Sequence, residues 1–286
     1  MRIAACVLLY HPKENDLKNI LSYLSKVDKL YIYDNTENKK TIIPFENVNK
    51  IVYFSDCENK GLSIRLNQAC KQAISDGFDF LMTMDQDSSF SPENLTNYFA
   101  DIKNYSNKAN VGIFGLEYSN ENKISNAKNI IATEVHALIT SGSVINLNHY
   151  HKIGGFDENL FIDGVDFDYC FAILKKGLKC ILFENNSICH SLGVKTKRAS
   201  IKTLYLIKKE KQLHSPLRLY YIIRNMLYLE KKYALLFPKF ILERKKRYSS
   251  QIISNMLYSK NIFIILKYRL KAINDFKNNK MGKIEL

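Results

Sequence analysis

The chain has 286 residues, of which 46% are apolar, and it carries 42 Lys and Arg against 28 Asp and Glu, a net charge of +14. This length suits one large domain, or a domain of roughly 200 residues with an appendage, and the apolar content argues against a disordered chain. No apolar run approaches the roughly 18 residues that a membrane-spanning helix needs, so we expect no transmembrane segment.

Short apolar runs alternate with helix-like segments in the first half of the chain, the pattern of a sheet with crossover helices. The apolar start lacks a signal-peptide cleavage site and is interpreted as a buried strand. Strands are predicted over Ile3–Tyr10, Leu30–Asp34, Lys50–Phe54, Phe80–Met84 and Val111–Leu116. Helices are predicted over Glu14–Lys26, Leu62–Asp76 and Pro92–Asn104, the last with Ser91 as N-cap. The predicted fold is therefore α/β, a doubly wound, mostly parallel sheet with helices on both faces.

The pattern changes after residue 130. An apolar segment, ALITSGSVI, is followed by a turn at Gly154-Gly155, an acidic cluster and a strand-like run over Lys179–Phe183. From about Pro216 the chain is basic and has incomplete apolar stripes at helical spacing. We therefore expect a first domain over residues 1–214 and a basic, α-helical region over residues 215–286.

Positive charge is concentrated in the last third of the chain. Residues 195–286 hold 23 Lys and Arg against five Asp and Glu, a net charge of +18, whereas residues 1–194 have a net charge of −4. This segregation favours an anionic partner for the basic region, such as a membrane surface. A region that only packs on the rest of the chain, or that forms a dimer interface, is the alternative.

Six cysteines are scattered without C-x-x-C or zinc-finger spacing, and several lie inside apolar runs. Buried, reduced thiols are typical of a cytoplasmic protein. We therefore expect a cytoplasmic location, at the inner face of the plasma membrane if the basic region binds lipid.

Two carboxylates in D-x-D spacing, Asp85 and Asp87, follow the predicted strand Phe80–Met84. Such a pair can hold Mg2+ or Mn2+, and the ion can neutralise a diphosphate. An acidic pair at a turn or at a helix entry is the alternative. Because doubly wound sheets bind ligands at the carboxyl ends of their strands, the position favours a site, and the same rule points to Tyr10, His11 and Asp34.

Three more acids, Asp163, Asp166 and Asp168, lie within six residues of one another. A carboxylate there can accept a proton from an acceptor hydroxyl, although acids at a helix N-terminus are an equally good interpretation. His190 follows a strand-like run and can ligate a divalent ion or contact phosphate, but a lone histidine is more often structural. Arg65, after an Asn-Lys-Gly turn, can pair with phosphate.

Motifs of other enzyme classes are missing. The chain has no G-x-G-x-x-G, no Walker loop and no G-x-S-x-G, which weakens interpretation as a dehydrogenase, a kinase or a hydrolase. A basic nucleic-acid-binding protein accounts for the charged tail, but it leaves the ordered acidic motifs unexplained, since acids repel a polyanion. We therefore expect no nucleic-acid partner.

The order of these segments resembles the family 2 glycosyltransferases of the GT-A fold, and in particular the bacterial rhamnosyltransferases. The matching segments cover residues 3 to about 230 and are Tyr10-His11-Pro12, Asp34-Asn35-Thr36, Asn59-Lys60-Gly61 with Asn67, Asp85-Gln86-Asp87-Ser88, Ile139-Thr140-Ser141-Gly142-Ser143, Gly154-Gly155-Phe156-Asp157, Phe161 to Cys170, His190-Ser191-Leu192-Gly193, and Arg218-Leu219-Tyr220-Tyr221 with Arg224-Asn225. No single motif is specific, but their common order is.

The resemblance implies a metal-dependent, inverting hexosyltransferase whose residues 1–214 form a GT-A nucleotide-sugar-binding and catalytic domain. It implies donor contacts from Tyr10, His11, Asp34, Arg65 and Asp85, and Mg2+ or Mn2+ on Asp87 and His190. It implies Asp166 as the base, with Asp163, Asp168, Ser141 and Gly142 on the acceptor side. Two positions depart from the family pattern. Val165 stands where many relatives carry Glu, and Ala172 stands where an arginine is common, which puts that arginine's contact in doubt.

The resemblance also implies the substrates. The favoured donor is dTDP-L-rhamnose, with a UDP-sugar as the alternative, and the acceptor is a glycan or lipid-linked oligosaccharide of a bacterial surface polysaccharide. A catalytically dead scaffold is disfavoured because both acidic segments are intact.

Overall fold

The computed structural model describes residues 1–38, 41, 49–119, 131–190, 195–200, 206–259 and 261–285. The chain divides into two units. The sheet unit consists of Met1–Glu158 and Val165–Ser191, and the helical unit consists of Asn159–Gly164 and Leu192–Leu286. The domain boundary expected at residue 214 stays a prediction.

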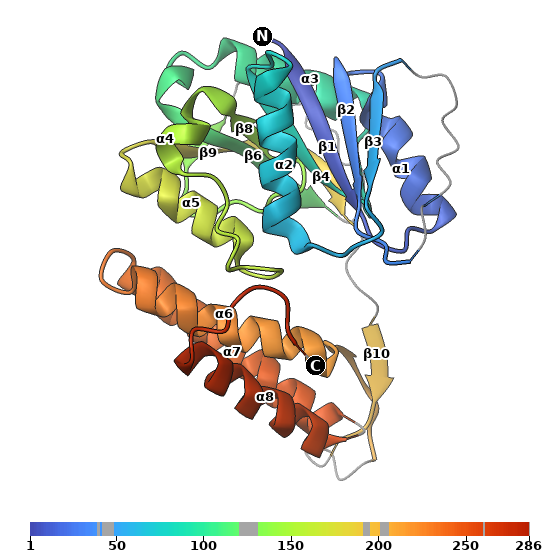
Figure 1. Ribbon diagram of the computed structural model, residues 1–286, viewed down its shortest axis with the longest axis vertical. Coiled ribbons are helices and arrows are strands. Elements are labelled where there is room, and N and C mark those ends of the chain that lie inside the picture. The colour runs from blue at the N-terminus through green and yellow to red at the C-terminus, as the bar shows by residue number, and fades with distance from the viewer. Residues whose placement is uncertain are drawn as a thin grey trace. The chain divides into compact units, whose positions relative to one another are not determined.

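The sheet unit contains a nine-stranded sheet in the order β3-β2-β1-β4-β8-β6-β9-β5, with β7 paired to β9 (Figure 1). Its strands are β1 (Ile3–Leu9), β2 (Lys29–Asp34), β3 (Ile51–Ser55), β4 (Phe80–Asp85), β5 (Ser88–Ser89), β6 (Val111–Ser119), β7 (Ala132–Glu134), β8 (Val144–Asn146) and β9 (Lys179–His190). The strands β5, β7 and β8 run against the other six. The predicted fold class, a mostly parallel sheet with helices, is confirmed.

The helices of the sheet unit are α1 (Glu14–Leu24), α2 (Gly61–Ser75), α3 (Pro92–Asn104), α4 (Tyr150–Ile153) and α5 (Val165–Lys175). The strands and helices expected before residue 117 are all present, with ends that differ by three residues or fewer. Ser91 caps α3 as predicted: its hydroxyl accepts a hydrogen bond from the Asn94 amide at 3.2 Å, and Pro92 occupies the first turn.

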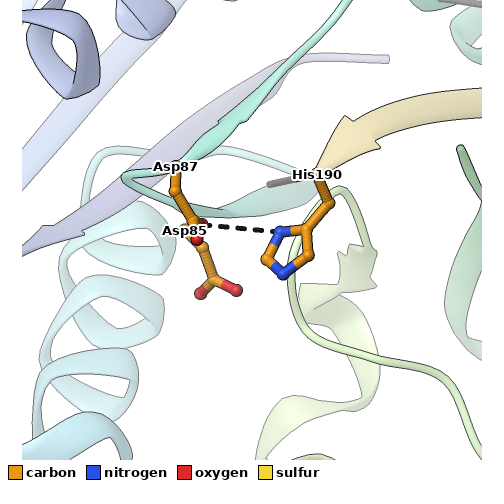
Figure 2. A group of neighbouring side chains, drawn as sticks. All are labelled: Asp85, Asp87 and His190. Atoms are coloured by element: carbon orange, nitrogen blue, oxygen red, sulfur yellow. Dashed lines mark ion pairs between the residues drawn. The ribbon is translucent and has the colours of Figure 1, made fainter. Parts of the chain in front are cut away.

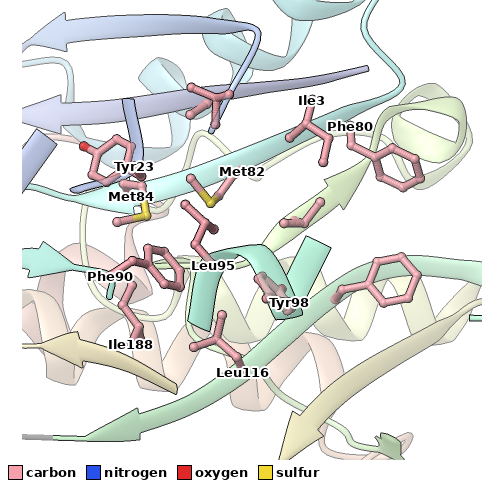
Figure 3. Packing of buried hydrophobic residues seen from close by; sticks show 14 of the residues in the cluster. Ile3, Tyr23, Phe80, Met82, Met84, Phe90, Leu95, Tyr98, Leu116 and Ile188 are labelled. Carbon is pink, nitrogen blue, oxygen red and sulfur yellow. The ribbon is translucent and has the colours of Figure 1, made fainter. Parts of the chain in front are cut away.

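The main core lies between one face of the sheet and helices α1 and α3 (Figure 3). Alternate residues of β1, from Ile3 to Leu9, point into it, as the two-residue period of a strand requires. They meet Tyr23 of α1 and Leu95 and Tyr98 of α3. Ala4 and Cys6, which lie between them, are also fully buried, since helix α2 lies against β1. Burial on both faces explains why this strand is continuously apolar.

Strand β9 is longer than its sequence predicts. The expected strand ended at Phe183, because the polar residues Glu184 to Asn186 follow it, but the observed strand continues to His190. The pairing with β6 skips these three residues, passing from Leu116–Phe183 to Glu117–Ser187. The skipped segment is held because the amides of Asn185 and Asn186 donate to Asp101 of α3 at 2.8 and 2.6 Å. The bulge therefore allows β9 to continue as far as His190.

The helical unit consists of a hairpin, β10 (Lys195–Arg198) with β11 (Lys209–Gln212), and helices α6 (Pro216–Tyr233), α7 (Pro238–Tyr258) and α8 (Ile262–Lys277). Arg224 of α6 is 1% exposed, and its guanidinium donates to the Tyr220 hydroxyl at 3.0 Å and to the Gly282 carbonyl at 2.7 Å. The Tyr220 hydroxyl donates to Asp275 of α8 at 2.8 Å. A buried arginine thus joins α6 to α8 and to the end of the chain.

In the described part of the chain, no helix combines the length and the apolar character that crossing a membrane requires.

Candidate active site

The site lies at the edge of the sheet where β1, β2 and β4 end. These strands are parallel, and their register pairs Leu9 with Asp34 and Leu8 with Asp85. Asp34 and Asp85 therefore close neighbouring strands at the level where β1 passes into Tyr10 and His11. Tyr10, His11, Asp34 and Asp85 therefore lie at the same edge of the sheet, as expected for residues at the carboxyl ends of parallel strands.

Asp85, Asp87 and His190 form one cluster, with one ligand atom from each lying within 4.8 Å of the others (Figure 2). The short strand β5 follows Asp87 and pairs Ser88 with His190, so the histidine is held opposite the D-x-D segment. The His190 Nδ1 lies 3.4 Å from Asp87 Oδ1. All three side chains are partly exposed. Two carboxylates and an imidazole fit a divalent cation and leave positions for oxygens of a ligand.

Two serines connect the cluster to the loop before β8. The Asp85 amide donates to Ser141 Oγ at 3.1 Å, and this hydroxyl donates to Ser88 Oγ at 2.8 Å. Ser88 Oγ lies 2.8 Å from His190 Nδ1. Both serines are buried, and a polar partner at one ring nitrogen fixes the orientation of the imidazole. The acceptor-side role expected for Ser141 stays a prediction.

Gly142 shapes the same loop. Its backbone has φ +76°, and its amide donates to the Thr83 carbonyl of β4 at 2.7 Å. A Cβ at this position would lie 3.0 Å from the Ile188 side chain of β9. The positive φ therefore favours glycine, and a Cβ would also press on the end of the Ile188 side chain. This accounts for the glycine of the Thr-Ser-Gly-Ser sequence without assigning Gly142 a contact to substrate.

Tyr10 and His11 extend from the end of β1. The Tyr10 amide donates to Gln86 Oε1 at 2.8 Å, and the Gln86 side chain donates back to the Tyr10 carbonyl at 3.3 Å. The His11 amide donates to Thr36 Oγ1 at 2.9 Å. Gln86, the middle residue of the D-x-D segment, thus ties β4 to β1. Tyr10 is 47% exposed and its ring is available to a ligand.

Asp34 is fully buried at the end of β2. Its carboxylate accepts hydrogen bonds from the amides of Thr36 and Thr41 at 2.9 and 3.0 Å and from the Tyr53 hydroxyl at 2.7 Å. Burial works to raise the pKa of Asp34, but these hydrogen bonds outweigh it and hold the pKa below its ordinary value. The carboxylate is therefore kept charged.

Arg65 of α2 is 3% exposed, and protein acceptors meet all five of its N–H groups. It donates to Asn35, Gln68 and the Glu58 carbonyl at 2.8 to 3.0 Å, and to both oxygens of Asp56. Hydrogen bonding to Arg65 holds the pKa of Asp56 far below its usual range. Arg65 thus bonds Asn35 and Asp56, the residues that follow β2 and β3, and the predicted donor contact stays a prediction.

Asp166 and Asp168 lie in the first turn of α5. Asp168 is 2% exposed, whereas Asp166 is half-buried. Burial raises the pKa of Tyr118, at the end of β6, and the charges of Asp85 and Asp166 raise it further. Both carboxylates therefore act on the same hydroxyl, which also donates to the Ser141 carbonyl. The ring of Tyr118 packs edge-on to His190 with centroids 5.9 Å apart.

Asp163 lies in the helical unit and is ion-paired. Arg218 of α6 donates to both of its carboxylate oxygens, at 3.1 and 3.3 Å. Asp163 has φ +60°, and the Asn225 amide of α6 donates to the carbonyls of Ile162 and Asp163 at 2.7 and 2.8 Å. Arg218 and Asn225 therefore hold Ile162 and Asp163 to α6. Asp163 therefore has a cationic partner in Arg218.

Sequence reasoning missed Tyr118 and Gln86 as parts of the site. Tyr118 lies two residues beyond the predicted end of its strand. The alternation of Phe114, Leu116 and Tyr118 is the one sequence pattern that indicates a longer strand. Gln86 was noted only as the residue between two acids. The Ser191-Leu192-Gly193 part of the histidine motif lies outside the described residues.

The fold is the GT-A fold, which solved glycosyltransferases share. The family model for glycosyl transferase family 2 matches residues 14–182, more than half of the chain. The chain therefore belongs to glycosyl transferase family 2.

Among curated proteins, the chain is similar to the dTDP-rhamnosyl transferase RfbF of Shigella flexneri, with 24% identity over 248 residues that cover 80% of each protein. Among solved structures, it resembles S. aureus TarS 1–349 in complex with UDP-GlcNAc, with 14% identity and a TM-score of 0.52 over 97% of this chain and 73% of the other. It also resembles GalNAc-T7 with UDP, GalNAc and Mn2+, with 12% identity and a TM-score of 0.58 over 97% and 56%. At these identities the two structures establish the fold alone.

Proposed function

We propose that this glycosyltransferase moves a sugar from a nucleoside diphosphate to a hydroxyl, with inversion, and that it needs a divalent metal ion. One observation carries the proposal: Asp85, Asp87 and His190 offer three ligand atoms within 4.8 Å at the ligand edge of the sheet. When bound there, Mg2+ or Mn2+ would stabilise the negative charge of the departing diphosphate. Asp87 and His190 are the proposed ligands, and Asp85 either joins them or contacts the donor.

The donor we favour is dTDP-L-rhamnose. Its support is the similarity to the Shigella flexneri dTDP-rhamnosyl transferase. A UDP-sugar is the alternative, since TarS and GalNAc-T7, which share the fold, bind UDP compounds. Tyr10 and His11 are proposed to face the donor. Asp34 is expected from the sequence to contact the donor, but it is fully buried and accepts hydrogen bonds from protein groups, so a donor contact would need the loop around it to move. Arg65 is proposed to support Asp34, since it donates to the neighbouring Asn35.

Asp166 is proposed as the base that takes the proton of the attacking hydroxyl. It is half-buried, and its charge acts on Tyr118 together with that of Asp85. Direct displacement needs the base and the leaving group on opposite faces of the sugar, and no covalent intermediate forms. Asp168 and Ser141 are proposed to support the acceptor side, with Gly142 shaping the loop and Asp163 held by Arg218.

We propose residues 1–214 as the catalytic domain and residues 215–286 as a basic region that attaches the enzyme to the inner face of the plasma membrane. The net charge of +18 over residues 195–286 supports attraction to anionic lipid. The acceptor is then a glycan or a lipid-linked oligosaccharide of a surface polysaccharide. A dimer interface on the same helices is the alternative.

A donor screen tests the proposal. Purified protein is incubated with dTDP-L-rhamnose, UDP-sugars and free nucleotides, with Mn2+ or with EDTA, and thermal stabilisation and donor hydrolysis are measured. We expect stabilisation by one nucleotide sugar, loss of turnover in EDTA, and the same loss in Asp87→Ala. The control variant Glu93→Ala removes an exposed acid on α3 and is expected to keep wild-type turnover.

Undiminished turnover in EDTA would remove the metal from the mechanism. A binding protein for nucleic acid would instead show salt-dependent retention on DNA or RNA without donor hydrolysis.

A further inference from the structure

The helical unit has a lysine-lined hollow of about 720 Å3 between the hairpin strand β11 and helix α7. We call it the lysine hollow. Lys209 and Lys211 line it from β11, and Lys245 and Lys246 line it from α7 together with three serines of that helix. No Asp or Glu is among its lining residues. Ammonium and hydroxyl groups, of which only Lys245 has a carboxylate partner among the described residues, make a surface that suits phosphate oxygens.

The local structure explains why the positive charges gather there. Because successive strand residues point to opposite sides, Lys209 and Lys211 share one face of β11, and Glu210 on the other face pairs with Lys197 at 3.4 Å. Lys245 pairs with Glu230 of α6 at 2.6 Å. Among the described residues, no carboxylate pairs with Lys209, Lys211 or Lys246, although Lys211 Nζ lies 5.6 Å from the ring centroid of Tyr258. These three ammonium groups can therefore meet an external anion.

A second hollow, of about 420 Å3, lies between α6, α7 and α8. We call it the apolar hollow. Ile223 and Met226 of α6, Ile252 and Met256 of α7, and Ile273 of α8 line it. It shares Lys245, Ser249 and Ile253 with the lysine hollow, so the two adjoin along α7. Ile253, on their common border, is 52% exposed. Glu230, Lys245 and Arg269 also line the apolar hollow, but most of its lining residues are apolar. A cationic recess therefore opens directly beside a mainly apolar one.

We propose that the two hollows together bind one lipid that carries a phosphate headgroup, with the headgroup in the lysine hollow and the hydrocarbon chain in the apolar hollow. This inference rests on the proposed membrane attachment, and it is independent of the donor and of catalysis. The positive charge of the lysine hollow favours a phosphate headgroup, and the adjoining apolar hollow favours a hydrocarbon chain. A nucleic acid would fill the lysine hollow but would leave the apolar hollow exposed to water.

The test uses soluble lipids below their micelle concentration. Calorimetric titration compares lysophosphatidic acid, which has both parts, with lysophosphatidylcholine, whose headgroup has no net charge, and with glycerol 3-phosphate, which has no chain. We expect lysophosphatidic acid to bind the full-length protein at least tenfold more tightly than either of the others. Equal affinity for lysophosphatidic acid and glycerol 3-phosphate would overturn the role of the apolar hollow.

Two pairs of variants locate the site. Lys209→Gln, Lys211→Gln and Lys246→Gln combined are expected to weaken lysophosphatidic acid binding by about 100-fold, from roughly 1 kcal/mol for each lysine. The matched control changes three other exposed lysines of the helical unit, namely Lys239, Lys267 and Lys277, to Gln. It removes the same charge and is expected to bind normally. If both triple variants weaken binding equally, net charge and not the lysine hollow attracts the lipid.

The second pair tests the border residue. Ile253→Gln is expected to weaken binding by roughly fivefold to tenfold through loss of apolar contact. Leu242→Gln is its control, because Leu242 is also on α7 and 53% exposed but lines neither hollow. Both positions are exposed enough for the variants to fold, and circular dichroism checks this. An Ile253→Gln variant with wild-type affinity would overturn the proposed binding site.

Flotation with phosphatidylglycerol vesicles separates this inference from membrane attachment. Vesicle binding without binding of monomeric lysophosphatidic acid would keep attachment and overturn the lipid site. If the protein binds neither vesicles nor lysophosphatidic acid, both membrane attachment and the lipid site are wrong. Donor hydrolysis, measured on the same sample, tests the transferase activity separately.

Discussion

Both units bury hydrogen-bonded polar groups, but they differ in how far their apolar side chains are exposed. In the sheet unit, buried polar groups such as Asp34 and Arg65 are enclosed in hydrogen bonds at the strand ends. In the helical unit, large apolar side chains lie in water, among them Leu235 at 99%, Leu206 at 83% and Phe263 at 78% exposure. The first arrangement suits a small ligand held in fixed geometry, and the second suits an extended, partly apolar partner. The contrast fits the proposed division between transfer in one unit and attachment in the other.

The largest expected effect is on the proposed base. Asp166→Asn keeps the size of the side chain but removes its basicity, so turnover is expected to fall by roughly 100-fold to 10,000-fold while donor affinity is retained. Steady-state kinetics and donor titration measure the two quantities separately.

Asp168→Asn and Asp163→Asn are compared with Asp166→Asn in the same assay. Near wild-type turnover in Asp166→Asn, with an inactive Asp163 or Asp168 variant, would show that the base is another acid of the cluster. If all three variants remain active, the acidic segment is structural and the proposed mechanism is wrong.

The next effect concerns the stability of the helical unit. Arg224→Met removes the buried guanidinium that bonds the Tyr220 hydroxyl and the Gly282 carbonyl, and it is expected to destabilise this unit by about 3 kcal/mol. Arg224→Lys keeps the charge but not the forked geometry, so only part of the stability should return. Urea unfolding followed by circular dichroism measures both. Unchanged stability in Arg224→Met would show that the network contributes little.

The sequence predicted the fold and the acidic half of the site, because both depend on local patterns. Apolar runs mark the strands, and Asp85 and Asp87 directly follow one of them. The geometry of His190 depends on the bulge at Glu184 to Asn186, which only the pairing of β9 with β6 reveals. Likewise, Ser141 reaches Asp85 and Ser88 because β8 inserts antiparallel to β4. Contacts between residues more than 50 positions apart cannot be predicted from a local sequence pattern.

A smaller effect is expected where two serines support the cluster. Ser88→Ala removes the hydroxyl 2.8 Å from His190 Nδ1, and the affinity for Mn2+ is expected to fall by roughly 10-fold to 100-fold, as for other residues that orient a metal ligand. Titration of Mn2+ followed by electron paramagnetic resonance measures this affinity without donor or turnover. Ser143→Ala is the matched control, since Ser143 is buried in the same loop but donates to the Ile139 carbonyl. Equal losses in both variants would point to a disturbed loop.

The smallest expected effect comes from Asp34 and depends on pH. Hydrogen bonds from Thr36, Thr41 and Tyr53 outweigh burial and hold its pKa below the ordinary value, so the folded protein binds this proton less tightly than the unfolded chain does. The charged carboxylate therefore stabilises the fold above the ordinary pKa of about 4, and the stabilisation is lost as the pH falls through the lower, folded pKa. Asp34→Asn cannot titrate, so its Tm should lie below that of the wild type by a constant amount between pH 5 and 7. Below about pH 4 the two Tm values should converge, because only the wild type loses stability from this group. Calorimetry at pH 7, 5, 4 and 3 measures the difference, and a gap that stays constant down to pH 3 would show that hydrogen-bond geometry, and not charge, accounts for the contribution of Asp34.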